Sequence, residues 1–229
     1  MSSVTMDISV VIPVLNEEKV IERNLRDLNK NLITETIISD GGSNDATVVI
    51  ASRYAKVVHS NPGRGTQMNL GAKAATCDIL LFLHADTILP DQWRARILSS
   101  MADEGVVAGA FSLSIESDNL SHRIIAATAN LRSRLIKLPY GDQGIFVKRS
   151  EFEKIGGFKD IPIMEDVDLM RRLKKSGKVV VLDDKVKTSA RRWEKEGVVY
   201  TTIRNWLLLT LYFMGVTPER LYKLYKAVR

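Results

Sequence analysis

The sequence predicts an α/β fold in which a mostly parallel central sheet is flanked by helices, with further helices toward the C-terminal end. Two observations predict it. Short runs rich in β-branched residues alternate with stretches in which apolar residues recur at helical spacing. No linker or internal repeat divides the 229 residues, of which 45% are hydrophobic, so we expect one domain around one sizeable core.

Strands and helices alternate regularly up to about residue 101. The run at residues 8–15 is β-branched and of strand length, and apolar residues at helical spacing after Asn16 predict a helix that reaches Leu32. Further strands are expected at 36–39, 56–59 and 78–83, and further helices at 43–54, 63–75 and 91–101. Strands joined by helices in this way favour parallel pairing.

After residue 101 the alternation loosens. We expect strands at 106–115, 144–147 and 179–182, helices at 120–138 and 165–175, and a turn around Phe152. The change of pattern predicts two parts within the domain, at about 1–101 and 102–195, followed by helices at about 196–229.

The charge balance limits the classes of ligand that we expect, and the cysteine content limits the disulfide and metal sites that are possible. The 33 basic and 27 acidic side chains give a net charge of +6, which favours phosphate-bearing ligands or an anionic membrane surface; because the charges are spread along the chain, nucleic acid is not favoured. The single cysteine, Cys77, excludes an intrachain disulfide framework and a cysteine zinc cluster, and we interpret it as a packing residue. The polar N-terminus lacks an apolar signal region, so the expected location is the cytoplasm.

Polar residues gather where the predicted strands end. In open sheets of parallel strands, ligands bind beyond the carboxyl ends of the strands. A lone aspartate there would serve as a helix cap or turn residue, but several polar residues at one edge predict a binding site. The residues concerned are Asn16, Glu17, Asp40, His84 and Asp86.

Ordered motifs in the chain resemble family 2 glycosyltransferases of the GT-A fold, from about residue 8 to residue 193. Residues 11–17 and 39–45 resemble the two nucleotide loops of that family, and 64–71 the segment that approaches ribose and diphosphate. Residues 83–86 take the place of its Asp-any-Asp motif, and 165–166 that of its catalytic base. Each motif is weak alone, and the shared order makes the resemblance specific.

The resemblance implies a metal-dependent, inverting transfer of a sugar from a nucleotide-diphosphate sugar, by analogy a UDP-sugar, to an unknown acceptor hydroxyl. The nucleotide-binding half would be about 1–101 and the acceptor half about 102–195. The residues implied in donor binding are Pro13, Asn16, Glu17, Asp40, Arg64, Asn69 and His84. A finer similarity, to the small radical-SAM or selenodomain-associated transferases, some assigned to arsenosugar synthesis, rests on 84–86, 140–144 and 190–194.

Asp86 is the expected ligand of a divalent cation, Mg²⁺ or Mn²⁺. His84 stands where the family has the first aspartate of its metal motif, which removes one hard oxygen ligand. A diphosphate and water molecules supply most of an octahedral shell, so Asp86 alone suffices as an anchor. His84 then has three alternative roles: a hydrogen bond to ribose, orientation of Asp86, or simply the end of a buried strand.

Asp166, with Glu165 beside it, is the expected catalytic base. It opens a helix, where the positive end of the helix dipole keeps a carboxylate ionised. Helix capping is the alternative, although capping explains one acid rather than Glu165, Asp166 and Asp168 together. A single displacement with Asp166 as base predicts inversion at the anomeric carbon.

Four further residues are expected to touch the sugar, the diphosphate or the acceptor. The polar, glycine-rich segment 139–144 predicts a cleft wall, with a plain turn as the alternative, and the basic segment 191–193 predicts a loop closing over the diphosphate, with a surface turn anchored by one tryptophan as the alternative. The residues concerned are Asp142, Gln143, Arg192 and Trp193. Arg64 has a glycine on each side, which permits close approach to a phosphate.

The apolar run at 203–216 is too short for the roughly 20 residues that span a bilayer. It covers the core, forms a homodimer seam, or lies on a membrane, at the inner face, beside basic residues of the tail such as Arg220 and Lys223.

Two other functions remain as alternatives. A nucleotidyltransferase of the same fold would carry a glycine-rich loop after the first strand, where this chain has residues 13–17 instead. A noncatalytic sugar-nucleotide binding module gains support from His84 and loses it from Asp86 and Asp166. A dehydrogenase is disfavoured because no Gly-any-Gly-any-any-Gly motif follows the first strand.

Overall fold

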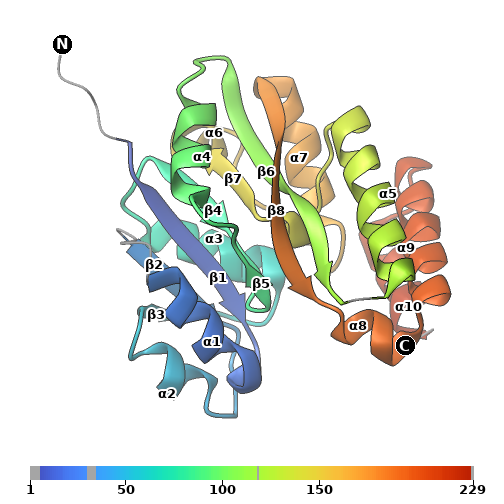
Figure 1. The fold of residues 1–229 in the computed structure, drawn as a ribbon, viewed down its shortest axis with the longest axis horizontal. Helices are drawn as coiled ribbons and strands as arrows, with labels where there is room; N and C mark the ends of the chain where they lie inside the picture. Colours follow the sequence, from blue (N-terminus) through green and yellow to red (C-terminus); the bar gives the residue numbers. More distant parts are fainter. Residues whose placement is uncertain (1–5, 30–34, 118, 228–229) are drawn as a thin grey trace.

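The computed structural model describes residues 6–29, 35–117 and 119–227, and an eight-stranded sheet runs through it in the order β3-β2-β1-β4-β7-β6-β8-β5 (Figure 1). The strands are β1 (Ile8–Val14), β2 (Glu35–Asp40), β3 (Lys56–His59), β4 (Ile79–Phe82), β5 (Thr87–Ile88), β6 (Val106–Glu116), β7 (Ile145–Lys148) and β8 (Lys178–Ser189). All strands except β7 and β5 run in one direction, which confirms the mostly parallel sheet.

Helices cover both faces of the sheet. They are α1 (Glu18–Asn29), α2 (Thr47–Ala51), α3 (Arg64–Ala74), α4 (Trp93–Met101), α5 (Leu120–Ile136), α6 (Arg149–Lys154), α7 (Glu165–Ser176), α8 (Arg191–Glu196), α9 (Val198–Phe213) and α10 (Pro218–Ala227), with a short 3₁₀ turn, η1 (Gly141–Gln143). Figure 1 shows α5, α9 and α10 gathered at one side of the sheet.

The central strand β1 is buried on both faces because its β-branched residues alternate between two cores. Val10 and Ile12 pack in the core that contains α1 and α4, whereas Val11 belongs to the core that contains α3 and α7. Gly71 of α3 sits so close to β1 that an added Cβ would lie 2.3 Å from Val11 Cγ1. Only glycine allows this approach of helix to strand.

The antiparallel strand β7 brings distant segments to one edge. Because β7 lies between β4 and β6 and runs against both, the turn that precedes it, η1, meets the loops that follow them. Pairing of Phe82 with Ile145 fixes this arrangement. The carboxyl ends of β1, β2, β4, β6 and β8 therefore share one edge with η1.

Several element boundaries differ from those the sequence predicted. The strand expected at 179–182 extends to Ser189, because β8 continues beside β6 past its polar middle. The helix expected at 43–54 is only α2, α6 replaces the turn around Phe152, and β5 had no predicted counterpart. Leu32, where the first helix was expected to end, lies outside the described residues. Cys77 is buried, as its packing role predicted.

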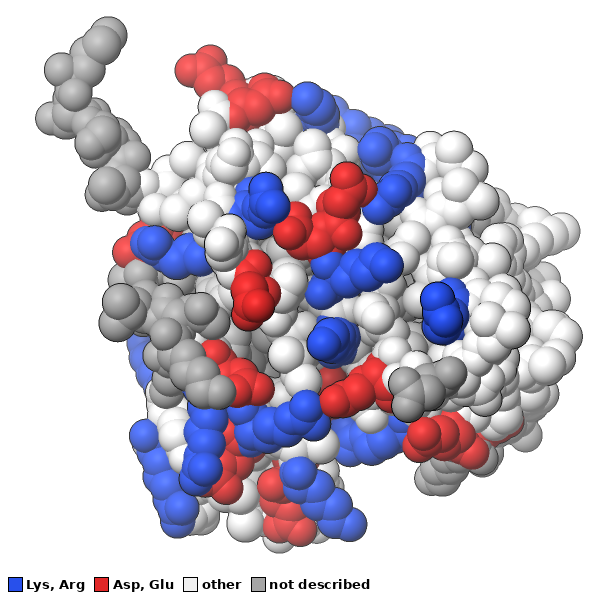
Figure 2. Space-filling model, viewed as in Figure 1, with Lys and Arg blue, Asp and Glu red and all other residues white. Residues whose placement is uncertain are grey.

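Charge is unevenly placed on the face drawn in Figure 2. Lys, Arg, Asp and Glu are interspersed over the strands and the N-terminal part, whereas the surface over α5 and α9 is mostly white. Within the described part of the chain, no helix combines the length and apolar character needed to cross a bilayer.

Candidate active site

Two loops at the sheet edge hold each other in place. Asn16 takes a left-handed backbone conformation, with φ 56°; its N–H donates to Ser43 Oγ at 2.9 Å and its Oδ1 accepts from Asn44 N–H at 2.9 Å. The N–H of Glu17 donates to Thr47 Oγ1 at 2.8 Å. The loop after β1 is thus tied to the loop after β2, which fixes the positions of Asn16 and Glu17.

Asp40 orders the second loop from within. Its buried carboxylate accepts the N–H groups of Gly42 and Ser43 at 3.0 and 3.1 Å, and His59 Nδ1 lies 3.5 Å away. Burial alone would raise the pKa of Asp40, but the hydrogen bonds from Ser43 and Gly42 outweigh it and lower that pKa. Asp40 therefore acts as a loop organiser here, and its contact with a base stays a prediction.

The guanidinium of Arg191 bridges the carboxylate of Glu17, which follows β1, and that of Asp86, which follows β4. Arg191 Nη2 lies 3.2 Å from Asp86 Oδ2 and 3.4 Å from Glu17 Oε2. Burial raises the pKa of Glu17; Arg191 opposes that rise, and the charge of Asp86 adds to it. Arg191 belongs to the basic segment 191–193 that was predicted to close over the diphosphate, although the arginine singled out within it was Arg192. The side chain of Arg192, which was selected, lies outside the described residues.

Asp166 meets the end of β4 through η1. Its Oδ2 accepts the N–H of Gly141 at 2.8 Å, and its Oδ1 accepts that of Val167 at 2.7 Å. A Cβ added to Gly141 would lie 3.0 Å from His84 Nε2 and 3.5 Å from Asp166 Oδ2. The imidazole of His84 and the carboxylate of Asp166 therefore flank one glycine, and the strand that leads to Asp86 shares an edge with the start of α7.

Glu165 is enclosed beside Asp166. It is 7% exposed, and burial, followed by the charge of Asp166, raises its pKa to about 7, while Arg64 acts in the opposite direction. Met164, the preceding residue, has a φ of 68°, which is costly for a side chain of this size. Met164 is the N-cap of α7 and makes no side-chain capping hydrogen bond, and Glu165 is the first residue of the helix.

Arg64 acts electrostatically on carboxylates of both groups. It is exposed at the first turn of α3, and its charge opposes the rise in the pKa of Glu17 and of Glu165 that burial causes. The next residue, Gly65, runs so close to another segment that an added Cβ would lie 2.7 Å from the carbonyl oxygen of Lys159. The absence of a side chain at Gly65 thus lets Arg64 stand at the edge of the site.

Comparison with known proteins identifies the family of this chain. The family model described as Glycosyl transferase family 2 matches residues 9–158, more than half of the chain. The chain belongs to glycosyl transferase family 2.

Curated relatives resemble this family 2 chain over part of their length. It is 34% identical over 97 residues to glucosyl-3-phosphoglycerate synthase of Mycolicibacterium smegmatis, which is 37% of this chain and 32% of that protein. It is 24% identical over 218 residues to the uncharacterized glycosyltransferase YaiP of Escherichia coli, covering 82% of this chain and 54% of YaiP. The chain thus spans about half or less of the length of these relatives.

Solved structures share its fold. Glucosyl-3-phosphoglycerate synthase of Mycobacterium tuberculosis, in a complex with Mn²⁺, UDP-glucose and phosphoglyceric acid, superposes with a TM-score of 0.61 and 20% identity, over 79% of this chain and 71% of that one. The same enzyme with Mg²⁺ and UDP gives a TM-score of 0.60 and 21% identity, over 79% and 70%. At this identity the likeness establishes the GT-A fold that the motifs predicted.

Two residues expected to bind substrate make hydrogen bonds that hold the fold together. Gln143 is fully buried: its Nε2 donates to the carbonyl of Phe111, and its Oε1 accepts from Ser133 Oγ and from the N–H of Tyr140. Every one of these partners belongs to the protein, so Gln143 positions η1, and its contact with a substrate stays a prediction.

The second residue is Asn69. Its Nδ2 donates to the carbonyl of Phe158 at 2.8 Å and its Oδ1 accepts the N–H of Phe158 at 2.9 Å. Asn69 therefore fixes the segment that follows α6 against α3, and its contact with a donor stays a prediction.

The structure gives the positions of other predicted residues, and their roles stay proposals. Pro13 is half-buried within β1, opposite Ser39 of β2. Asp168, the third acid of α7, pairs with Lys159 at 3.0 Å and with Arg172 at 2.7 Å, which accounts for it structurally.

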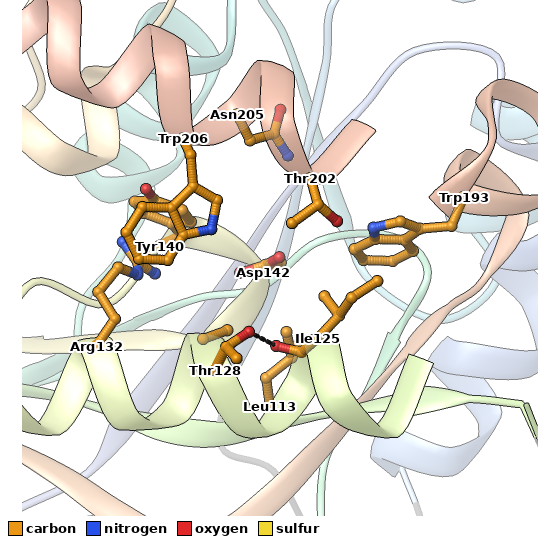
Figure 3. Close-up of a pocket in the computed structure, with 11 residues that line it drawn as sticks. Leu113, Ile125, Thr128, Arg132, Tyr140, Asp142, Trp193, Thr202, Asn205 and Trp206 are labelled. Carbon is orange, nitrogen blue, oxygen red and sulfur yellow. Dashed lines mark hydrogen bonds between the residues drawn. The ribbon is translucent and has the colours of Figure 1, made fainter. Parts of the chain in front are cut away.

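Trp193 and Asp142 line a pocket between α5 and α9 that sequence reasoning did not foresee (Figure 3). Trp193 is nearly buried and packs with Ile115, Ala126 and Ala190, beneath the segment that carries it. In Figure 3, residues of α5 point up into the pocket and residues of α9 point down, with Asp142 behind them. The lining residues are Leu113, Ile125, Thr128, Ala129, Arg132, Tyr140, Asp142, Trp193, Thr202, Asn205 and Trp206.

The residues on the donor side could hold a divalent cation only if a substrate supplied further oxygen ligands. Within the described parts of the chain, no three His, Cys, Asp or Glu side chains are arranged to hold a metal together. Asp86 and Glu17 share the single guanidinium of Arg191, which leaves negative charge to be balanced. One or two carboxylates completed by phosphate oxygens and water is the ligand set that Mg²⁺ prefers.

Proposed function

We propose that this chain transfers a sugar from a nucleotide-diphosphate sugar to an acceptor hydroxyl, with inversion at the anomeric carbon. The observation that carries the proposal is the bond of 2.8 Å between Gly141 N–H and Asp166 Oδ2, beside His84. It puts a carboxylate from α7 at the edge where β4 leads to Asp86. Family membership supports the same reaction class.

Asp166 is the proposed base. Backbone N–H groups hold both of its oxygens, and it lies in the first turn of α7. In the reaction, the acceptor hydroxyl passes its proton to Asp166 while its oxygen bonds to the anomeric carbon. The bond from that carbon to the diphosphate oxygen breaks on the opposite face, so one displacement inverts the configuration.

The loops after β1 and β2 are the proposed nucleotide site, with Asn16 and Glu17 on the first and Asp40 within the second. Arg64 and Arg191 are the cations available to a diphosphate at this edge. A guanidinium donates two parallel hydrogen bonds to phosphate oxygens, which fixes orientation as well as charge. UDP is the proposed nucleotide because it occupies the solved structures of the synthase with the same fold.

Asp86 is the residue proposed to hold Mg²⁺ or Mn²⁺, with Glu17 near enough to add charge. When bound, the cation neutralises the negative charge that develops on the departing diphosphate. His84 supplies no anionic oxygen, so this chain relies more on phosphate oxygens for the remaining ligands than an Asp-any-Asp chain does. Arg191 leaves Asp86 for the diphosphate in this proposal.

Replacing Asp166 by Asn tests the base directly. The variant should bind UDP with Mn²⁺ as the wild type does and lose about 10²–10⁴-fold in turnover, the range expected for general base catalysis. Calorimetry with UDP and a transfer assay over a panel of nucleotide sugars measure the two quantities. Asp103→Asn, an exposed carboxylate that pairs with Lys178, is the matched control. Wild-type turnover in Asp166→Asn would exclude the role.

A noncatalytic sugar-nucleotide binding module is the second candidate, favoured only by His84 in place of an acid. It predicts UDP binding without transfer to any acceptor, and it predicts that His84→Asp restores tighter metal-dependent binding without turnover. If UDP is released only when both an acceptor and Asp166 are present, the chain is an enzyme and not a binding module.

A further inference from the structure

The helices beyond the sheet expose two apolar stripes. The exposed apolar residues on α5 are Leu120, Ile124, Leu131, Leu135 and Ile136, and those on α9 and its C-cap are Val199, Tyr200, Ile203, Trp206, Leu207, Phe213 and Met214. Most of them recur at spacings of three, four and seven, which puts most of each set on one side of its helix. Such surfaces are rare on monomeric soluble proteins unless they contact something.

Both stripes border the pocket between the two helices. With about 100° between successive residues of an α-helix, the exposed side of α5 lies next to the side that carries Ile125, Thr128 and Arg132 into the pocket. On α9, Trp206 belongs to both sets: it lines the pocket and is 51% exposed. An apolar surface therefore leads from the outside of the molecule into the pocket.

The pocket in turn reaches the proposed base. Tyr140 and Asp142 line it, and Gly141 between them donates to Asp166. Arg132 stacks on Tyr140 with its Cζ 3.4 Å from the ring centre, and its Nη1 is buried without a hydrogen-bond partner among the described residues. Burial raises the pKa of Tyr140 to about 12, so this wall is uncharged apart from Arg132 and Asp142. A ligand with an apolar body and an oxygen at one end suits such a lining.

Charge near the stripes favours one kind of partner. Exposed basic residues on or next to these helices include Arg123, Arg134, Lys137, Arg220 and Lys223. Helices α5 and α9 contain no acidic residue, and α10 contains only Glu219. A second copy joined by a two-fold axis would bring these like charges together. Anionic lipid headgroups complement them, and a helix too short to cross a bilayer can lie in its interface.

We propose that the surface of α5 and α9 docks on an anionic lipid membrane and that the pocket behind it takes its acceptor from there, an amphiphilic alcohol. The acceptor's apolar body lies between Trp193 and Trp206, and its hydroxyl points past Asp142 toward Asp166. This inference rests on the proposed function for the identity of the pocket as an acceptor site, and on the two stripes and their charges for the membrane.

The three tryptophans make the orientation measurable. Trp93 and Trp193 are 1% and 9% exposed, so Trp206 is the tryptophan that can meet acyl chains. Vesicles of phosphatidylglycerol with acyl-brominated phosphatidylcholine should quench the emission of the wild type. Trp206→Phe should still sediment with the vesicles and lose the quenching. Quenching of equal depth in Trp206→Phe, or no quenching at all, would overturn the proposed orientation.

A matched pair of exposed residues tests the surface itself. Leu207→Asp on α9 should reduce the vesicle-bound fraction about tenfold, because it places a charge in the interface. Val49→Asp on α2 makes the same change at a residue of similar exposure, 62% against 54%, and should leave binding unchanged. Vesicles of phosphatidylcholine alone should bind more weakly than those with phosphatidylglycerol. A concentration-dependent dimer that Leu207→Asp abolishes would assign the surface to a second copy and refute membrane docking.

The pocket is tested without sugar transfer. 1-Decanol below its solubility limit should raise the Tm of the wild type, whereas glycerol should not. Thr202→Phe, which fills the pocket, should lose this shift and keep vesicle binding. If 1-decanol does not raise the Tm of the wild type, the acceptor class is refuted. Asp166→Asn should behave as the wild type in all these assays, so loss of transfer alone would count against the proposed function and not against this inference.

Discussion

Glu165 couples folding to pH. Its ordinary pKa of 4.5 rises to about 7 in the folded chain because the carboxyl is buried beside Asp166. Between these values the folded state holds a proton that the unfolded state has released, so the free energy of unfolding falls as the pH rises through this window. Above about pH 7 the full cost of the buried charge is present, of order 3 kcal/mol.

Replacing Glu165 by Gln should remove that dependence. Urea unfolding at pH 5 and pH 8 should give the wild type a larger loss of stability than Glu165→Gln, with the variant more stable at pH 8 by up to about 3 kcal/mol. Glu153→Gln, a carboxyl on the surface of α6 paired with Arg149, serves as the control. If wild type and Glu165→Gln lose equal stability, burial does not control this group.

Arg191 neutralises two carboxylates that would otherwise face each other. Its removal leaves Glu17 and Asp86 without the cation that both contact. Arg191→Ala should weaken UDP binding in the absence of metal by about tenfold or more, the value of a charge-assisted hydrogen bond. Calorimetry measures it. Arg96→Ala, which breaks the pair with Asp184 elsewhere on the molecule, should bind UDP normally.

The sequence alone revealed the local structure of some site residues better than the contacts of others. Asp166 was expected at the start of a helix, and α7 begins at the residue before it, while its role as base stays a prediction. The backbone contacts of Gln143 and Asn69 could not be foreseen, because an amide that satisfies backbone groups looks, in sequence, like an amide that binds sugar. Within the basic segment 191–193 the sequence singled out Arg192, and only the folded chain shows that Arg191 pairs with Glu17 and Asp86.

The turn η1 is an element whose position depends on one side chain. Gln143 links it to Phe111 of β6 and to Ser133 of α5. Gln143→Leu keeps the size but leaves these buried partners unsatisfied, at roughly 1–3 kcal/mol for each group. We expect lower stability in urea unfolding, together with reduced turnover, because Gly141 no longer holds Asp166. Ser133→Ala, which removes only one of the bonds, should cost about 1 kcal/mol. Full activity in Gln143→Leu would show that η1 is held by other contacts.

Boundaries of elements were predicted well where one periodicity dominates. The β-branched runs of β1 and β3 and the apolar stripe of α7 lie where expected. β8 was cut short because its polar stretch around Asp183 and Asp184 gave no strand pattern, yet pairing with β6 keeps it extended. Such pairing is a tertiary effect that local sequence does not carry.

Binding of UDP and Mn²⁺ should raise the stability of the whole molecule. UDP with Mn²⁺ binds the folded state alone, so at about one hundred times the Kd it adds about 2.7 kcal/mol to the free energy of unfolding and raises the Tm. Asp86→Ala should lose the part of this Tm shift that depends on Mn²⁺. Differential scanning fluorimetry with UDP, with Mn²⁺ and with both measures it, and Asp91→Ala is the control. An unchanged Mn²⁺ effect in Asp86→Ala would remove Asp86 from the metal site.

The overall architecture was largely predictable, because alternation of strands and helices in the first part restricts the topology. The pocket between α5 and α9 was not, since it depends on how two helices pack far from the strands that the motifs describe. The apolar run of α9 was noticed in the sequence, but only its exposure in the folded chain separates a surface helix from a core helix.

The reversed strand β7 also bears on how relatives diverge. The excursion from the end of β6 through α5 to η1 leaves and re-enters the sheet at the same edge. Its length and its outward residues are therefore free to vary without shifting the register among β1, β2, β3 and β4, which stays set by their own pairing. Substitutions in this excursion could therefore alter the pocket wall that Tyr140 and Asp142 form without disturbing the loops after β1 and β2.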